Sequence, residues 1–202
     1  MPTLRSFKQL SEAEVEPVSL AAAKAQVGLL PEQEDDDALL LRLISTGRRL
    51  VEQRLGATLA TRQYRATFVP DLEWHGHHHY HRRVGLRIPA PPLLVDGTHP
   101  LTVTVNGVTI DASTYSVDSD SAPAVIRFTT WPTFDDDSPL VVTYWAGPAP
   151  GGRIEPAAES VILLYVAHGF RNREAIITGT IAEVLPMGVE TLLASISITG
   201  AY

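Results

Sequence analysis

The sequence predicts an α+β protein in which an antiparallel β domain is inserted into a bundle of about four helices. Three observations support this prediction. Before residue 56, apolar residues recur at intervals of three and four, which is typical of amphipathic helices. Between residues 57 and 152, short alternating segments are separated by turn residues. After residue 153, a long apolar segment of helical type follows a Gly/Pro linker.

We divide the chain accordingly. Residues 1–18 are an N-terminal arm, residues 19–56 and 153–196 are a helical core, residues 57–152 are the inserted β domain, and residues 197–202 are a C-terminal tail. The arm is polar and has no clear period, so we expect it to become ordered only against a neighbour.

The first helix is predicted from Leu20 to Val27, because Ser19 is a good N-cap and Gly28 a good terminator. A longer helix follows the acidic residues 34–37, which suit the positive end of a helix dipole, and it ends at Gly56. Gly47 lies in its middle, where we expect it to allow close approach of another helix. Apolar positions form one stripe of this helix, and we expect most of its polar residues to face solvent or a partner: Arg42, Arg48, Arg49, Glu52 and Gln53.

The β domain begins with the alternating segment Arg62–Val69. Further strands are predicted at residues 84–88, 101–105, 108–110, 115–117, 124–128 and 140–145, with Asn106-Gly107 as a hairpin turn. About six or seven short strands with this spacing favour an antiparallel sheet that is curled or sandwiched.

A third helix is predicted from Ala157 to Phe170, with Pro156 in its first turn. The segment from Ala175 to Leu185 is interrupted by Gly179, and a last short helix is expected from Val189 to about Ile196.

Composition narrows the class of protein. The chain has 202 residues, no cysteine and no apolar run near the ~20 residues that a membrane helix needs, which excludes disulfides and argues against a membrane protein. Residues 1–7 show no secretory signal, and the lack of cysteine fits a reducing cytoplasm. The net charge of −7 argues against a sequence-specific nucleic-acid binder, but like charge would let DNA slide past without adhering.

Histidines gather between residues 74 and 81. The alternate residues His75, His77, His79 and His81 could share a strand face and bind a metal such as zinc. No cysteine or carboxylate is interleaved, so we interpret the segment as a surface loop and predict no physiological metal site. The aspartates at 135–137 lack the spacing and the final glutamate of a calcium loop, and we interpret them as a solvated turn.

No motif indicates catalysis. The chain lacks a Gly-x-Ser-x-Gly motif, a P-loop and a dinucleotide fingerprint, and no spacing links Ser45, His168 and an aspartate into a triad. We therefore predict that the protein is not an enzyme and needs no cofactor. For Arg171, Arg173 and Glu174 two interpretations stay open: capping of the third helix and an ion pair between subunits.

Several separated segments, taken in order, resemble one protein family. They are Leu20–Lys24, Asp35–Ala38, Gly56, Thr61–Tyr64, the prolines at 89, 91 and 92, Tyr115–Asp118, Trp131-Pro132, Tyr144–Gly147, Pro156, Tyr165, Arg173-Glu174, Leu185-Pro186 and Leu192-Leu193. Together they resemble the head–tail connector proteins (adaptor or head-completion proteins) of long-tailed bacteriophages and gene transfer agents. The chain departs from the family at Ala194-Ser195-Ile196, where Pro-Tyr-Arg is usual, and the histidine loop is not a family feature.

The resemblance implies a structural virion protein that is assembled in the bacterial host cytoplasm. Such proteins form a ring, usually a dodecamer, beneath the portal, extend the DNA channel and join head to tail. The implied partners are other copies, the portal, a stopper or tail-terminator protein and passing double-stranded DNA. The rival interpretation is a stand-alone protein-binding module, part of a tail or an enzyme accessory domain.

Two sets of contact residues are predicted on this basis. Arg48, Arg49, Arg171, Arg173 and Glu174 are candidates for contacts between subunits. The C-terminal segment is apolar and nearly uncharged after Glu190, and it would dock on the portal through Leu192, Leu193, Ile196, Ile198 and Tyr202. The alternative is that this segment folds back onto its own helices.

Overall fold

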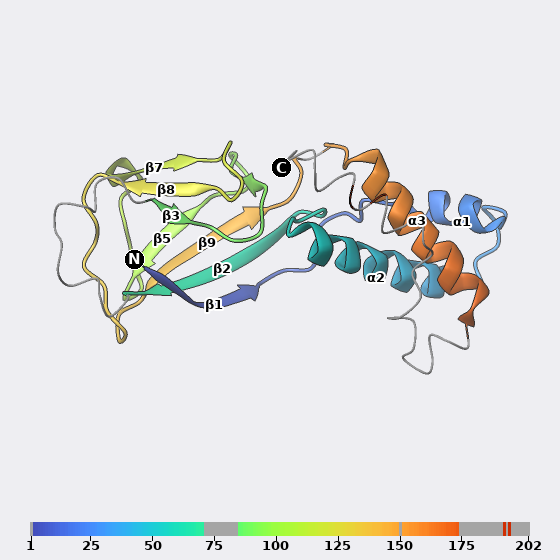
Figure 1. Cartoon of the computed structure of the whole chain (residues 1–202), viewed down its shortest axis with the longest axis horizontal. Coiled ribbons are helices and arrows are strands. Elements are labelled where there is room, and N and C mark those ends of the chain that lie inside the picture. The colour runs from blue at the N-terminus through green and yellow to red at the C-terminus, as the bar shows by residue number, and fades with distance from the viewer. Residues whose placement is uncertain (1, 71–84, 150, 174–191, 193, 195–202) are drawn as a thin grey trace. The chain divides into compact units, whose positions relative to one another are not determined.

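The structure is a computed structural model that describes residues 2–70, 85–149 and 151–173, together with residues 192 and 194. The chain forms two compact units (Figure 1). The sheet unit contains residues 2–14 and 60–149, and the helical unit contains residues 15–59 and 151–173. The chain is thus a mixture of helices and antiparallel sheets, as predicted.

The first two helices begin and end close to the expected residues. Helix α1 spans Leu20–Val27, and the Ser19 hydroxyl accepts a hydrogen bond from the Ala22 N–H at 3.1 Å. Helix α2 spans Asp37–Leu55. Gly28 and Gly56 follow these helices with φ of 78° and 65°, the left-handed conformation that glycine adopts without steric cost.

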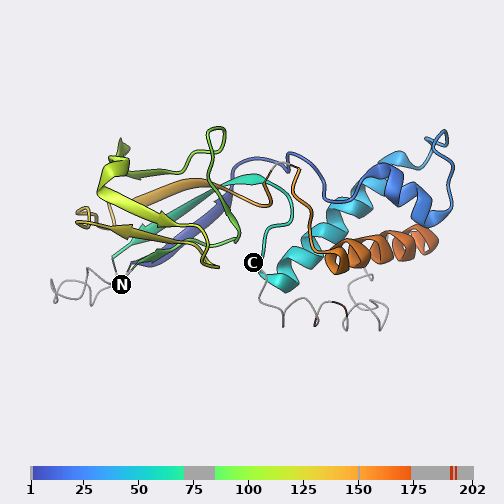
Figure 2. The ribbon, with the colours of Figure 1, turned by 90° about the horizontal axis from the view of Figure 1, so that it is seen from above.

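Helix α3 spans Pro156–Arg171 and lies beside α2 (Figure 2). A Cβ atom on Gly47 would lie 3.1 Å from Cδ1 of Tyr165 and 3.5 Å from Cγ2 of Ile162, so the predicted close approach at Gly47 is confirmed. The core of the helical unit is apolar: Ala23, Leu40, Leu43, Ile44, Val51, Ala158, Val161, Ile162, Tyr165 and Val166.

The larger sheet has six strands, and β2 (Arg62–Val69) and β9 (Leu140–Ala146) pair along its centre. Its order is β1-β2-β9-β5-β6, with β4 also paired to β9. The remaining strands are β1 (Thr3–Gln9), β4 (Leu93–Leu94), β5 (Thr102–Val105) and β6 (Val108–Thr109).

A second sheet of three strands, in the order β3-β8-β7, packs against the first (Figure 1). Its strands are β3 (Leu86–Arg87), β8 (Val125–Phe128) and β7 (Tyr115–Asp118), and a short 3₁₀ turn, Ala112–Thr114, precedes β7. Both sheets contribute to one core, so the predicted antiparallel pairing is confirmed, and of the two arrangements left open, curled or sandwiched, the structure shows the sandwich. This core includes Tyr64, Ala66, Phe68, Leu86, Val103, Ile126, Phe128, Leu140, Val142 and Tyr144.

The N-terminal residues correct one prediction. Residues 3–9 are not an arm that waits for a neighbour, because they form β1 and pair antiparallel with β2. As an edge strand, β1 is exposed or half-exposed on both faces, so its sequence lacks the alternation that reveals a half-buried strand. The two-residue strand β4 was missed because it is too short to show a period.

Several predictions lie outside the described residues. They include the histidine segment, the interrupted segment 175–185 and most of the last helix and tail. The described part of the chain contains three α-helices, and the fourth expected helix is represented only by Leu192 and Ala194, both helical. None of the described helices is long and apolar enough to cross a membrane.

Candidate functional site

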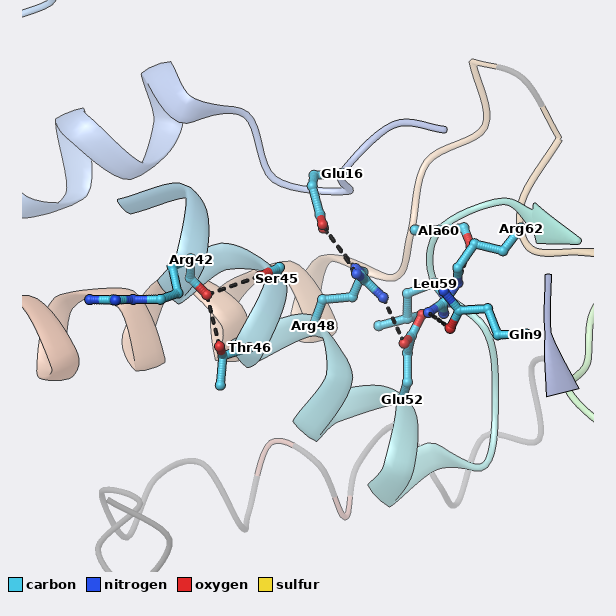
Figure 3. Close-up of polar contacts among 10 residues, drawn as sticks. All are labelled: Gln9, Glu16, Arg42, Ser45, Thr46, Arg48, Glu52, Leu59, Ala60 and Arg62. Carbon is cyan, nitrogen blue, oxygen red and sulfur yellow. Dashed lines mark hydrogen bonds and ion pairs between the residues drawn. The ribbon is translucent and has the colours of Figure 1, made fainter. Parts of the chain in front are cut away.

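A charged cluster in the described part of the helical unit is centred on Arg48 of α2 (Figure 3). Its side chain is buried, and Nε and Nη2 donate to the two carboxylate oxygens of Glu16 at 2.7 and 3.1 Å. Nη1 donates to Glu52, one turn further along α2, at 2.9 Å. This fork geometry is the strongest form of arginine–carboxylate pair.

Glu52 extends this cluster beyond the end of α2. One carboxylate oxygen accepts from Arg48, and the other accepts the backbone N–H of Leu59 at 2.9 Å. Burial alone would lower the pKa of Arg48, but the hydrogen bonds that Arg48 donates to Glu16 and the charges of Glu52 and Glu16 outweigh it and raise that pKa. The cluster therefore ties α2 to the segment before α1 and to the segment after α2.

The prediction that Arg48 faces solvent or a partner is wrong. The side chain is 2% exposed and fully engaged within its own subunit, so it is not available to a neighbouring copy. Arg49 is exposed, as is Arg171 at the end of α3, so both stay candidates for a contact between subunits. Glu174 lies outside the described residues.

Arg173 joins the end of α3 to the start of α2. Its Nη2 atom lies 2.9 Å from Oδ2 of Asp36, and its guanidinium lies 4.4 Å from the ring centroid of Phe170. Its Nε also donates to the Phe170 carbonyl at 3.4 Å, which is a contact of the capping type. These contacts favour the capping interpretation for Arg173, whose side chain is still half-exposed.

A second charged cluster lies in the sheet unit and was missed by the sequence analysis. His99 is 3% exposed, and its Nδ1 lies 2.9 Å from both carboxylate oxygens of Asp96. Its Nε2 lies 3.4 Å from Oε2 of Glu14, and its ring meets Trp145 edge-on at 5.0 Å. The hydrogen bond to Asp96 raises the pKa of His99 and lowers that of Asp96.

Glu14 and Glu16 lie on either side of the point where the chain passes from the sheet unit to the helical unit. Glu14 belongs to the sheet unit, where its backbone N–H donates to Thr61 O at 3.0 Å and its carboxylate approaches His99. Glu16 belongs to the helical unit, where it holds Arg48. Val15 between them is 75% exposed. An ion pair within the sheet unit thus fixes Glu14, and an ion pair within the helical unit fixes Glu16.

The chain passes from the helical unit back to the sheet unit at residues 59–62, and hydrogen bonds within the sheet unit fix this segment. Arg62 is buried, and its Nε donates to Ala60 O at 3.2 Å while Nη1 donates to Gln9 Oε1 at 3.3 Å (Figure 3). The Thr61 hydroxyl donates to Pro148 O at 2.7 Å.

The other candidate residues have structural explanations where they are described. Oδ1 of Asp135 accepts the N–H groups of Asp137 and Ser138, so the aspartates at 135–137 form the predicted turn. Within the described ranges no group of three or more histidines, aspartates and glutamates could hold a metal ion. The four candidate metal-binding histidines fall outside those ranges. Among the predicted portal-binding residues only Leu192 is described, and it is half-buried.

The chain matches no protein-family model and no curated protein by sequence. Its fold is similar to those of several solved chains, including the following three. The first belongs to the neck of an empty gene transfer agent (GTA) particle computed with C6 symmetry, with a TM-score of 0.69, 18% identity and 94% of both chains covered. The second belongs to the virion of a native GTA particle, with a TM-score of 0.69 and 16% identity. The third belongs to the neck of a native GTA particle computed with C12 symmetry, with a TM-score of 0.68 and 14% identity. The second and third matches each cover 94% of this chain and 93% of the other. At these identities the likeness shows the fold, and both units of this chain take part in it.

Proposed function

We propose that this protein is a structural component of the neck of a gene transfer agent or tailed-phage particle. In this proposal it forms a ring beneath the portal, extends the DNA channel and joins head to tail. One observation carries it: the fold matches chains from GTA particles, two of them from necks, over 94% of this chain and at least 93% of theirs. A match of this extent involves the whole architecture rather than one widespread domain.

Two features of the chain support the proposal. The charged clusters at Arg48 and His99 are engaged within their own units, which is the arrangement expected of a rigid building block rather than of a reactive site. The net charge of −7 suits a protein through whose ring DNA must pass without adhering. The ring symmetry is proposed by analogy with the neck particles computed with C6 and C12 symmetry.

Contact with the portal is assigned to the C-terminal segment, which carries Leu192, Leu193, Ile196, Ile198 and Tyr202 and lacks charge after Glu190. Burying these side chains against the portal would remove apolar surface from water.

The decisive experiment measures mass and shape, with and without a portal protein from a gene transfer agent or tailed phage of the same host. Light scattering and negative-stain electron microscopy should show a small species alone and a closed ring on the portal. Removing residues 195–202 should leave the fold intact, as judged by circular dichroism, and abolish portal attachment. A protein that stays small and does not bind the portal would instead be a stand-alone binding module.

A further inference from the structure

The strands of the larger sheet contain no acidic residue, although the chain has 23 Asp and Glu against 16 Lys and Arg. Four cations lie on these strands: Arg5 and Lys8 on β1, and Arg62 and Arg65 on β2. Arg62 is buried, and Arg5 donates to the backbone carbonyl of Asp136 at 2.9 Å. Lys8 and Arg65 remain as the exposed cations without such a bond within the described residues.

Lys8 and Arg65 lie directly opposite each other in the ladder between β1 and β2. The neighbours of Arg65 on β2, Tyr64 and Ala66, are buried in the core, so Arg65 points to the opposite, outer face of the sheet. On that face the next residue across is Thr143 of β9. Like charges at directly opposite positions repel each other, and neither side chain forms an ion pair with a described residue. This pair of cations, which we call the basic pair, would be stabilised by an external anionic group.

A complementary group lies on the helical unit of the same chain, in the segment that connects α1 and α2. This segment and the start of α2 contain five acidic residues. Asp37 lies 2.8 Å from Nζ of Lys24, and Asp36 lies 2.9 Å from Nη2 of Arg173, so both are neutralised internally. The other three are exposed and form no ion pair with a described residue; we call them the acidic loop: Glu32, Glu34 and Asp35.

We propose that the basic pair of one copy binds the acidic loop of the next copy in the ring. The inference rests on the proposed function, because a closed ring of identical subunits needs two different, complementary surfaces on each subunit. Opposite charges on the two surfaces guide the approach and fix the register of such a contact. Two neighbouring cations supply few phosphate contacts, so the geometry favours the acidic loop over DNA as the occupant.

Charge exchange tests this contact. The double variant Lys8→Glu/Arg65→Glu and the triple variant Glu32→Lys/Glu34→Lys/Asp35→Lys should each lose the portal-bound ring. A chain that carries all five substitutions regains opposite charges at every contact and should form the ring again. The matched control is Arg42→Glu/Arg87→Glu, which makes the same change of net charge at exposed positions of α2 and β3 and should assemble normally. Circular dichroism verifies that each variant is folded.

The outcomes separate this contact from the proposed function. A wild-type protein that forms no ring with the portal overturns both. Rings of normal yield from the Lys8→Glu/Arg65→Glu variant overturn the contact and leave the proposed function standing. If the five-substitution chain is folded but does not assemble, the acidic loop is not the occupant. If the basic pair instead governs binding to a fluorescent DNA duplex while rings form normally, the occupant is DNA and the contact is refuted.

Discussion

The carboxylate of Glu16 receives two N–H groups of Arg48, a residue 32 positions later in the chain, at 2.7 and 3.1 Å. The arginine side chain is 2% exposed and that of Glu16 is 26% exposed. The pair therefore fixes the segment before α1 against the middle of α2, and its energy depends on both partners, because a buried charge that loses its partner is not compensated by water.

Replacing Arg48 by methionine should destabilise the helical unit by about 3 kcal/mol, the low end of the cost of breaking a buried pair, because Glu16 can regain some water. Methionine has a similar volume, so the loss in free energy of unfolding comes from the missing charge rather than from a cavity. Urea denaturation measures the free energy of unfolding. Arg49→Met, at the neighbouring exposed position, should change it by less than about 0.5 kcal/mol. Equal effects of the two substitutions would show that Arg48 is not held as described.

The sequence was informative where structure depends on local signals. Ser19, Gly28 and Gly56 mark helix ends through their own backbone and side-chain chemistry, and β2 shows the alternation of a strand with one buried face. It was uninformative where a partner comes from a distant segment. Arg48 occupies a position on α2 that suggests solvent exposure, and only the return of Glu16 buries it. His99 depends in the same way on Glu14, which is 85 positions away.

Gly147 should not tolerate alanine. Its φ of 129° is a conformation that residues with a side chain rarely adopt, and a Cβ atom there would lie 2.7 Å from Cα and 2.8 Å from N of Thr61. Its N–H also donates to Pro92 O at 2.9 Å, so the backbone cannot easily shift. We expect Gly147→Ala to lower the thermal midpoint of the sheet unit by several degrees, since about 1 kcal/mol corresponds to ~4–8 °C in a domain of this size. Gly97→Ala, where a Cβ meets nothing within 4 Å, should have little effect, and a midpoint of Gly147→Ala equal to wild type would contradict the geometry.

Gly47 should accept alanine but not leucine. An alanine Cβ at 3.1 Å from Cδ1 of Tyr165 requires a shift of a few tenths of an ångström, which the gain in helix propensity of about 1 kcal/mol offsets. Leucine would force α2 and α3 apart and should cost about 1–3 kcal/mol. Denaturant titration compares Gly47→Ala and Gly47→Leu with Thr46→Leu, a substitution at the exposed neighbouring position. The comparison separates the cost of packing α2 against α3 from the gain in helix propensity. A Gly47→Leu variant as stable as Thr46→Leu would show that the two helices do not meet there.

The attachment of Glu14 to His99 should weaken as the pH rises through the raised pKa of His99. When the ring is protonated, both nitrogens can donate, Nδ1 to Asp96 and Nε2 toward Glu14. The described side chains that face the His99 ring come from three places. Asp96 lies on the same loop, Glu14 follows β1, and β9 contributes Trp145, which carries no charge. Because the hydrogen bond to Asp96 raises the pKa of His99 in the folded state, the imidazolium stabilises the fold below its unfolded pKa of about 6.5. That contribution is lost as the pH increases through the raised value.

Asp96 behaves in the opposite sense, because its pKa is lowered by His99 and its contribution is lost only in acid. The difference in unfolding free energy between wild type and His99→Gln should therefore be largest at pH values between the titration of Asp96 and that of His99. It should decrease as the pH rises through the pKa of His99. Proton NMR of the His99 ring measures its pKa directly, and Asp96→Asn should shift that pKa downward because it removes the carboxylate that accepts from Nδ1. A His99 pKa at or below about 6.5 in the wild-type protein, or one that Asp96→Asn leaves unchanged, would rule out this account of the cluster.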